Sequence, residues 1–166
     1  MKEEFLEKIT LYEPILLKIC RMYCRTVEDE QDLYQDIVLQ LWKSYDRFRN
    51  ESKLSTWLYR IALNTAITRI RKDKRSVQGS SVPNDRMHQI PNQITDEKEE
   101  QFAAMMRAIS ILSSIDKAIM MLYLEEHSYQ EIGVVMGISE SNVGFKIHQI
   151  KDKLRRIIKE NSYGDR

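Results

Sequence analysis

The sequence predicts an all-α fold in which an N-terminal helical bundle and a C-terminal helix-turn-helix domain are joined by a flexible linker. Apolar residues recur at three- and four-residue steps over most of the 166 residues, the spacing that gives a helix one apolar face. The sequence has only five glycines and no sustained two-residue alternation typical of a half-buried strand. Residues 76–95 contain two prolines and little apolar periodicity. We therefore expect two domains, residues 1–75 and 99–166, with a linker at 76–98.

The first domain is expected to be a bundle of three amphipathic helices at about residues 4–23, 28–45 and 54–74. The second begins with four acidic residues in its first turns, where the helix dipole favours negative charge. Its expected inward stripe is Leu33, Ile37, Leu41 and Ser44. For the third helix we expect Leu58, Ile61, Ala62 and Thr65 to face inward and Thr56, Arg60, Asn64, Ile67 and Arg71 to face outward.

The helix at residues 28–45 carries a second stripe that mixes acids, an amide and one leucine. Its members are Asp32, Gln35, Asp36 and Leu39. On periodicity alone, an ordinary solvated face is the simpler interpretation. A docking surface for another protein is the alternative, and it requires an identified partner.

The second domain is expected to open with two helices, at about residues 99–113 and 116–125. Their apolar positions are expected in the core: Phe102, Met105, Met106, Ile109, Ile119, Leu122 and Tyr123. Methionine is flexible and fills irregular gaps, so we prefer core packing to a ligand surface for the two methionines of this set.

The most informative segment, residues 128–158, predicts a helix-turn-helix. Ser128 followed by Glu131 is a capping box that opens a short helix, and Gly137 stands where that helix must end in a left-handed residue. Ser139 then caps a longer helix. The inward stripe of this second helix is Val143, Ile147, Ile150 and Leu154. A short helix, a glycine-containing turn and a longer polar-fronted helix are typical of this motif.

In DNA-binding helix-turn-helix proteins the second helix lies in the major groove and its first residues meet the base edges. The residues expected to face DNA are Ser139, Glu140, Ser141, Asn142, Phe145, Lys146, Gln149 and Lys151. A helical hairpin used only for packing is the alternative. The basic residues that continue along the same helix favour the DNA-binding interpretation.

Charge is distributed unevenly along a chain whose net charge is only +1. Residues 1–42 hold five basic and nine acidic residues, whereas residues 43–75 hold ten basic and three acidic ones. From residue 143 onward, seven basic residues outnumber three acidic ones. Two separated basic segments favour two contacts with one polyanion.

Several classes of protein are excluded by the composition. The three histidines are dispersed, and no metal-ligand cluster, nucleophile paired with a base, or glycine-rich phosphate loop is visible. We therefore expect no enzyme activity, no catalytic residue, no metal, no cofactor and no small-molecule substrate. No apolar stretch approaches the roughly 18 residues of a membrane helix, and the start lacks a secretory signal, so a cytoplasmic protein is expected. Cys20 and Cys24 are expected to be buried thiols.

Three segments in order, residues 32–42, 55–67 and 128–143, resemble a bacterial RNA polymerase sigma factor of the extracytoplasmic-function (ECF) group in the sigma-70 superfamily. The resemblance extends over nearly the whole chain. It implies a factor that binds core RNA polymerase, recognises the minus-35 and minus-10 promoter elements, melts the promoter and directs initiation of transcription.

The resemblance also implies roles for the first domain, which is similar to sigma region 2. The stripe of Asp32, Gln35, Asp36 and Leu39 would dock on the coiled coil of the beta-prime subunit. The minus-10 element would be melted and a flipped base held by Tyr45, Phe48, Lys53, Thr56, Trp57, Arg60, Asn64 and Arg71. Trp42 is expected in the core, and Trp57 fits core packing and base stacking equally well.

The second domain is similar to sigma region 4 and would read the minus-35 duplex. The implied partners are core RNA polymerase, through its beta-prime and beta subunits, promoter DNA, and an anti-sigma factor of the kind that is often membrane-anchored. Gly144 stands where many members have a cation, so the bases that are read stay open. The alternative function is a stand-alone helix-turn-helix regulator independent of polymerase. Such regulators normally bind paired half-sites as dimers, and no heptad dimerisation helix is visible here.

Overall fold

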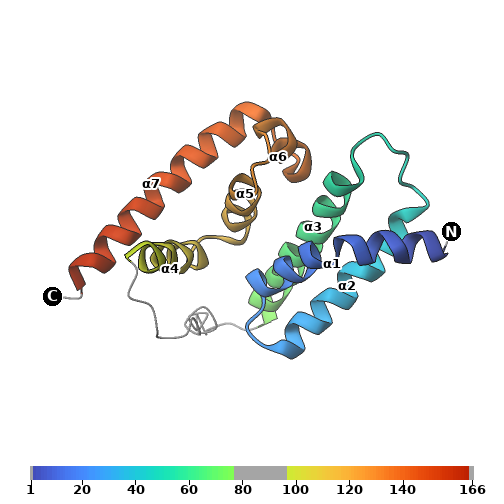
Figure 1. Cartoon of the computed structure of the whole chain (residues 1–166), viewed down its shortest axis with the longest axis horizontal. Helices are drawn as coiled ribbons and strands as arrows, with labels where there is room; N and C mark the ends of the chain where they lie inside the picture. Colours follow the sequence, from blue (N-terminus) through green and yellow to red (C-terminus); the bar gives the residue numbers. More distant parts are fainter. Residues whose placement is uncertain (1, 77–96, 165–166) are drawn as a thin grey trace. The chain divides into compact units, whose positions relative to one another are not determined.

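The protein consists of two compact units, Met1–Ser80 and Ser81–Arg166. The computed structural model describes residues 2–76 and 97–164. Within these ranges every regular secondary-structure element is an α-helix, as Figure 1 shows. The all-α prediction is therefore confirmed. Residues 77–96 of the predicted linker lie outside the described residues, while Glu97 and Lys98 already belong to a helix. In the described part of the chain no helix has the length and apolar character needed to span a bilayer.

The first unit is a bundle of α1 (Lys2–Tyr23), α2 (Val27–Tyr45) and α3 (Leu54–Ser76), in which each helix packs on the other two. Its largest fully buried side chains are Leu16, Ile19, Leu33, Ile37, Leu41, Leu58 and Leu63. The apolar stripe predicted for α2 is thus confirmed at its three aliphatic positions.

The buried face of α3 differs from the one that the sequence predicted. Leu58 and Ala62 are buried as expected, but Ile61 and Thr65 are only half-buried. Thr56 and Ile67 were expected to face outward, but they are only 9% and 6% exposed. Tyr59 and Leu63 are buried as well. The physical reason is that α3 contacts both α1 and α2, so it buries two adjoining stripes instead of one.

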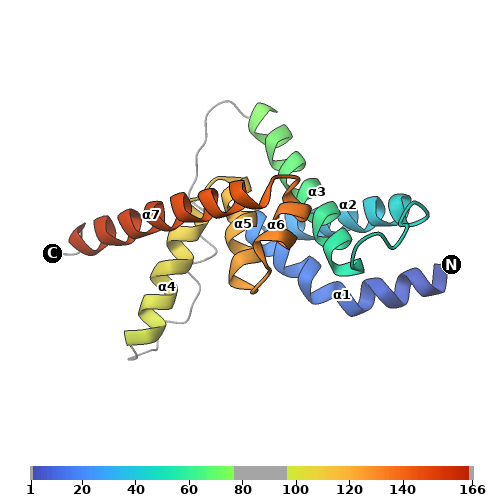
Figure 2. The same cartoon turned by 90° about the horizontal axis from the view of Figure 1, so that it is seen from above.

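The second unit contains α4 (Glu97–Ser110), α5 (Ser114–Leu124), α6 (Tyr129–Met136) and α7 (Glu140–Gly164), seen from a second side in Figure 2. The long α7 packs on the other three helices. The core is built from aliphatic side chains of all four helices and the α4–α5 turn: Ile109, Leu112, Ile119, Leu122, Ile132, Val135, Val143, Ile147, Ile150 and Leu154. Phe102 does not belong to this core, since it is 57% exposed on α4.

Helices α6 and α7 both have the predicted capping chemistry. The Ser128 backbone N–H donates to Glu131 Oε2 at 3.0 Å, and the Glu131 N–H donates to Ser128 Oγ at 3.1 Å. Gly137 ends α6 with a φ of 70°, and the Asn142 N–H donates to Ser139 Oγ at 3.2 Å. The predicted helix-turn-helix is therefore confirmed.

One glycine in this motif is required by close packing instead of by its backbone angles. A Cβ atom on Gly133 would lie 2.7 Å from the carbonyl oxygen of Ile138, a distance that real Cβ atoms do not adopt. The Ile138 N–H donates to the Gly133 carbonyl at 3.0 Å, which fixes the turn against α6. The absence of a side chain at residue 133 thus allows the two helices to join at this angle.

We expect both thiols to be unreactive in the folded protein. Cys20 is fully buried and Cys24 is 8% exposed, and burial raises the pKa of Cys20 to about 12 and that of Cys24 to about 11. At pH 8 an aromatic disulfide reagent should modify the native protein slowly and the urea-unfolded protein at once. Rapid modification of both thiols without denaturant would contradict this burial.

Candidate functional site

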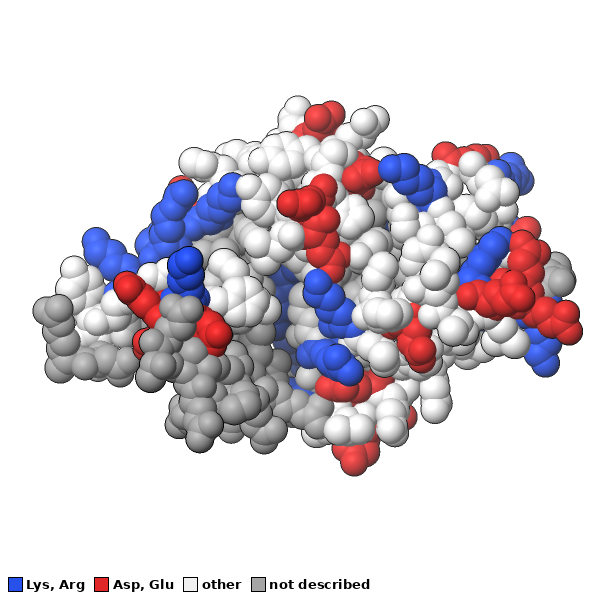
Figure 3. Space-filling model, viewed as in Figure 1, with Lys and Arg blue, Asp and Glu red and all other residues white. Residues whose placement is uncertain are grey.

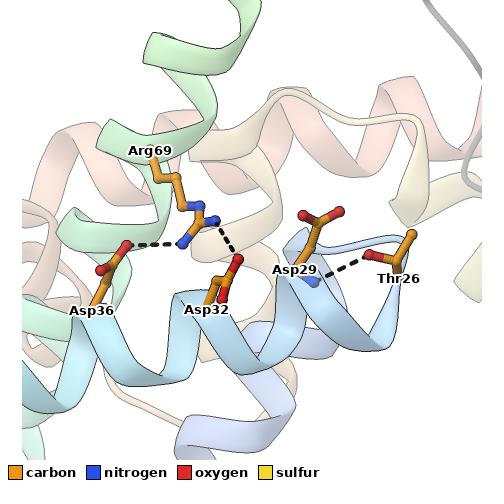
Figure 4. A network of polar contacts seen from close by, with 5 residues as sticks. All are labelled: Thr26, Asp29, Asp32, Asp36 and Arg69. Atoms are coloured by element: carbon orange, nitrogen blue, oxygen red, sulfur yellow. Dashed lines mark hydrogen bonds and ion pairs between the residues drawn. The ribbon is translucent and has the colours of Figure 1, made fainter.

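The α2 stripe, defined as Asp32, Gln35, Asp36 and Leu39, lies on the exposed side of the first unit. Its two acids are joined to α3 by one cation. Arg69 Nη1 donates to Asp36 Oδ2 at 2.8 Å, and Arg69 Nη2 lies 3.8 Å from Asp32 Oδ2, as Figure 4 shows. The arginine side chain is 26% exposed, whereas the two acids are more than half exposed. The carboxylates therefore keep faces open to solvent while Arg69 fixes their positions.

An apolar groove of about 350 Å³ borders this stripe between α1 and α2. It is lined by Lys2, Phe5, Leu6, Tyr34, Gln35, Val38, Leu39 and Trp42. Trp42 was expected in the core, yet it is 41% exposed, and its ring meets Phe5 in a T-shaped contact with a ring-centroid distance of 5.0 Å. The groove and the α2 stripe share Gln35 and Leu39, so an acidic and an apolar surface adjoin one another.

Aromatic rings cluster where α2 ends and α3 begins. Phe48 and Trp57 lie 5.0 Å apart between ring centroids, and Tyr45 lies 6.4 Å from Trp57 and 5.2 Å from Phe5. Trp57 is half-buried, consistent with both interpretations given to it. The structure brings Tyr45, Phe48 and Trp57 together, because they flank one short connection.

A charged pair holds Tyr45 in this cluster. Lys8 Nζ donates to the Tyr45 hydroxyl at 2.9 Å and to Glu4 Oε1 at 2.7 Å. The hydrogen bond from Lys8 lowers the pKa of the Glu4 carboxyl, and the bonds to Glu4 and Tyr45 raise the pKa of Lys8 above its usual range. This contact joins residues 37 positions apart, so no spacing in the sequence indicates it.

The polar residues predicted on α3 divide into two groups. Arg60, Asn64 and Arg71 are exposed, as is Lys53 just before the helix, whereas Thr56 is buried and cannot present its hydroxyl to a ligand without a local rearrangement. Asn64 borders a polar groove of about 560 Å³ between α2 and α3. The other residues lining it are Asp36, Gln40, Ser44, Ile61, Thr65, Thr68, Arg69 and Lys72.

In the second unit, α7 presents a polar face with one aromatic residue at its centre. Ser141, Asn142, Phe145 and Gln149 are exposed, and Phe145 is 63% exposed. The stripe on the other side of the helix is buried, as predicted. Ser139 and Glu140 at the start of the helix are exposed too.

Two of the predicted DNA-facing lysines contact α5 instead of projecting freely. Lys146 Nζ lies 3.7 Å from Asp116 Oδ1. Lys151 Nζ donates to the Tyr123 hydroxyl at 2.7 Å and lies 4.4 Å from the centre of that ring. Sequence spacing alone does not reveal these contacts, because both partners come from another helix.

The ring of Tyr129 lies beside Gly144. A Cβ atom on this glycine would lie 3.5 Å from Cε2 of the Tyr129 ring, an ordinary contact distance. Farther along α7, Lys153, Arg155, Arg156 and Lys159 are exposed. Figure 3 shows Lys and Arg side chains gathered over this part of the helix. Within residues 2–76 and 97–164, no three His, Cys, Asp or Glu side chains are arranged to hold a metal ion.

Comparison with known proteins agrees with this geometry. Residues 9–76 match the family model of sigma-70 region 2, and residues 102–154 match that of sigma-70 region 4. The chain belongs to the ECF group of sigma-70 factors. The resemblance predicted from the three sequence segments is thus confirmed, and this family consists of transcription initiation factors.

The alignments with individual relatives extend over most of this ECF sigma factor. It is 26% identical over 172 aligned residues to the ECF RNA polymerase sigma factor SigW of Bacillus subtilis. This alignment covers 96% of this chain and 91% of that protein. It is 24% identical over 144 residues to SigM of Mycobacterium tuberculosis, covering 86% and 71%. Its fold is similar to the sigma factor RpoE in a co-crystal structure with the anti-sigma factor NepR from Bartonella quintana, with a TM-score of 0.70, 19% identity, and 95% and 98% coverage.

Proposed function

We propose that this ECF sigma factor docks on core RNA polymerase through the α2 stripe and places its two units on the two promoter elements. The observation that carries the proposal is the presence, in one chain, of a region 2 bundle with an exposed acidic stripe and a region 4 helix-turn-helix. The stripe and the adjoining groove suit the beta-prime coiled coil, which would bury Leu39 and pair with the open faces of Asp32 and Asp36. This binding takes place in the cytoplasm, where polymerase and chromosome meet.

In the first unit, the aromatic cluster and the exposed polar residues of α3 would act on the minus-10 element. An unstacked base needs an aromatic surface, and such stacking contributes about 1 to 3 kcal/mol per base. Tyr45, Phe48 and Trp57 offer rings at one end of α3, and the exposed Arg60 and Asn64 lie along the same helix. These residues would hold the non-template strand once the duplex opens.

In the second unit, α7 would enter the major groove of the minus-35 element. Its first two turns carry the exposed polar side chains that reach base edges, and its C-terminal half carries exposed cations that suit phosphates. The beta subunit would contact this unit on the polymerase. Because the structurally similar RpoE was crystallised with the anti-sigma factor NepR, we also propose an anti-sigma factor as a partner of this chain.

The two-element mechanism can be tested with holoenzyme assembled from purified core polymerase and the full chain. Bacterial genomic fragments captured by this holoenzyme would supply a duplex with both elements. Scrambling either element should then weaken binding at least tenfold, since one of the two DNA contacts is lost. Equal binding of the intact and scrambled duplexes would rule out joint recognition.

Substitutions on α7 should separate base reading from phosphate contacts. We expect Asn142→Ala to change the preferred base at one or two upstream positions, with a discrimination loss of about 1 to 3 kcal/mol. Lys151→Ala should leave the preferred bases unchanged, because Lys151 Nζ donates to Tyr123 on α5 instead of facing DNA. It should also lower the free energy of unfolding by about 0.5 to 1.5 kcal/mol, because its bond to Tyr123 is lost.

The exposed Lys153 provides the matched control for this pair. Lys153→Ala should weaken binding of all duplexes without changing stability. The measurement is binding of a randomised upstream library by each variant holoenzyme, with urea unfolding of each free variant. Identical sequence profiles for Asn142→Ala and Lys151→Ala would show that the base-reading face is assigned incorrectly.

A further inference from the structure

The centre of the exposed face of α7 is occupied by an apolar side chain. Phe145 lies in the second turn of the helix and is 63% exposed. Residues 141 and 149, one turn before and after it, are exposed, as is Asn142 three positions earlier. Since the buried stripe of α7 lies on the other side, Phe145 projects outward between polar neighbours.

The side chains on this face suit one class of base pair. We define the reading face as Ser141, Asn142, Phe145 and Gln149, which contains no Lys or Arg of the kind that pairs with guanine. Asn and Gln pair with the N6 and N7 edge of adenine. Of the four bases, only thymine presents an apolar group in the major groove, its 5-methyl. The reading face therefore matches A·T pairs.

The neighbouring lysines are directed toward α5. Lys146 lies 3.7 Å from Asp116, and Lys151 donates to Tyr123 at 2.7 Å. The exposed side chains between Asn142 and Gln149 are then Phe145 and His148, and Phe145 is the apolar one of the two. The free energy falls when an exposed phenyl ring and a facing methyl group are both removed from water.

We propose that Phe145 reads the 5-methyl group of a thymine in the upstream promoter element. The inference rests on the proposed function, because it requires α7 to lie in the major groove. It adds a specificity determinant that depends on this residue being phenylalanine. Thymine would be preferred at this base pair over cytosine, which lacks the methyl group at the same position of the ring.

Deoxyuridine, which differs from thymine only by the missing methyl group, tests the proposal directly. Holoenzyme containing the full chain would first capture bacterial genomic fragments, and each thymine of the captured upstream element would then be replaced singly by deoxyuridine. At one position the wild type should bind about fourfold more weakly, the factor expected for one methyl-sized apolar group. Phe145→Ala should bind the thymine and deoxyuridine duplexes equally.

Phe102 provides the control, since it is another exposed phenylalanine, on α4 and 57% exposed. Phe102→Ala should keep the fourfold ratio. Equal wild-type affinity for thymine and deoxyuridine at all positions, or an unchanged ratio in Phe145→Ala, would overturn the proposal and leave the sigma function intact. Failure of the holoenzyme to capture any fragment would overturn the proposal together with the proposed function.

Discussion

Asp36→Arg is expected to weaken binding to core RNA polymerase at least tenfold and to abolish promoter-dependent transcription. Asp36 is 54% exposed in the α2 stripe, so its open face is available to a partner while one oxygen accepts from Arg69 at 2.8 Å. Reversal of the charge would remove the acid and place two arginines side by side. Pull-down of core polymerase by the tagged variant measures the first effect, and run-off transcription measures the second.

The ion pair with Arg69 supplies a control that separates docking from folding. In Asp36→Arg/Arg69→Asp the two charges are exchanged, so the link between α2 and α3 can form again while the outer face of α2 stays basic. A pair this exposed contributes only about 0 to 1 kcal/mol, so we expect the double variant to unfold near the wild-type temperature. It should still fail to bind polymerase. Recovery of polymerase binding would mean that Asp36 serves the fold alone.

Gly133→Val is expected to have the largest effect on the second unit. A Cβ at residue 133 would lie 2.7 Å from the Ile138 carbonyl oxygen, which is backbone and cannot swing aside. We expect the free energy of unfolding of this unit to fall by about 1 to 3 kcal/mol and binding to the upstream duplex to be lost. Urea unfolding followed by far-UV circular dichroism measures the change.

Tryptophan fluorescence offers an internal reference for that experiment, because both tryptophans, Trp42 and Trp57, belong to the first unit. The fluorescence transition should be unaffected by Gly133→Val. The matched substitution is Gly144→Ala, where the added Cβ would meet the Tyr129 ring at 3.5 Å. It should stabilise α7 by up to about 1 kcal/mol, since alanine replaces glycine inside a helix. A similar loss in both variants would contradict the close-approach explanation.

The features that the sequence predicted best are those determined by neighbours in the chain. The capping box at Ser128 and Glu131, the left-handed Gly137 and the cap at Ser139 all depend on contacts within four residues. The buried stripe of α7 follows from helical periodicity alone. These local rules were enough to predict the helix-turn-helix, but not the contacts of Lys146 and Lys151 with α5.

The features that the sequence did not predict depend on which helices pack together. Arg69 donates to Asp36, which lies 33 positions earlier in the chain, and no sequence spacing identifies such a pair. Thr56 and Ile67 are buried because α3 has two neighbours, and Trp42 is exposed because it borders the open groove between α1 and α2. Periodicity gives the direction of a buried stripe but not its width, which the neighbouring helices determine.

Transcription of bacterial genomic DNA by purified core polymerase, with and without this protein, tests the central claim most directly. With the wild-type chain, sequencing of transcript 5′ ends should reveal new start sites that share paired upstream and downstream elements. Core polymerase alone, or with Asp36→Arg, should produce none of these starts. Identical start sites with and without the protein, combined with tight binding of the protein alone to duplex DNA, would contradict the account and indicate a stand-alone regulator.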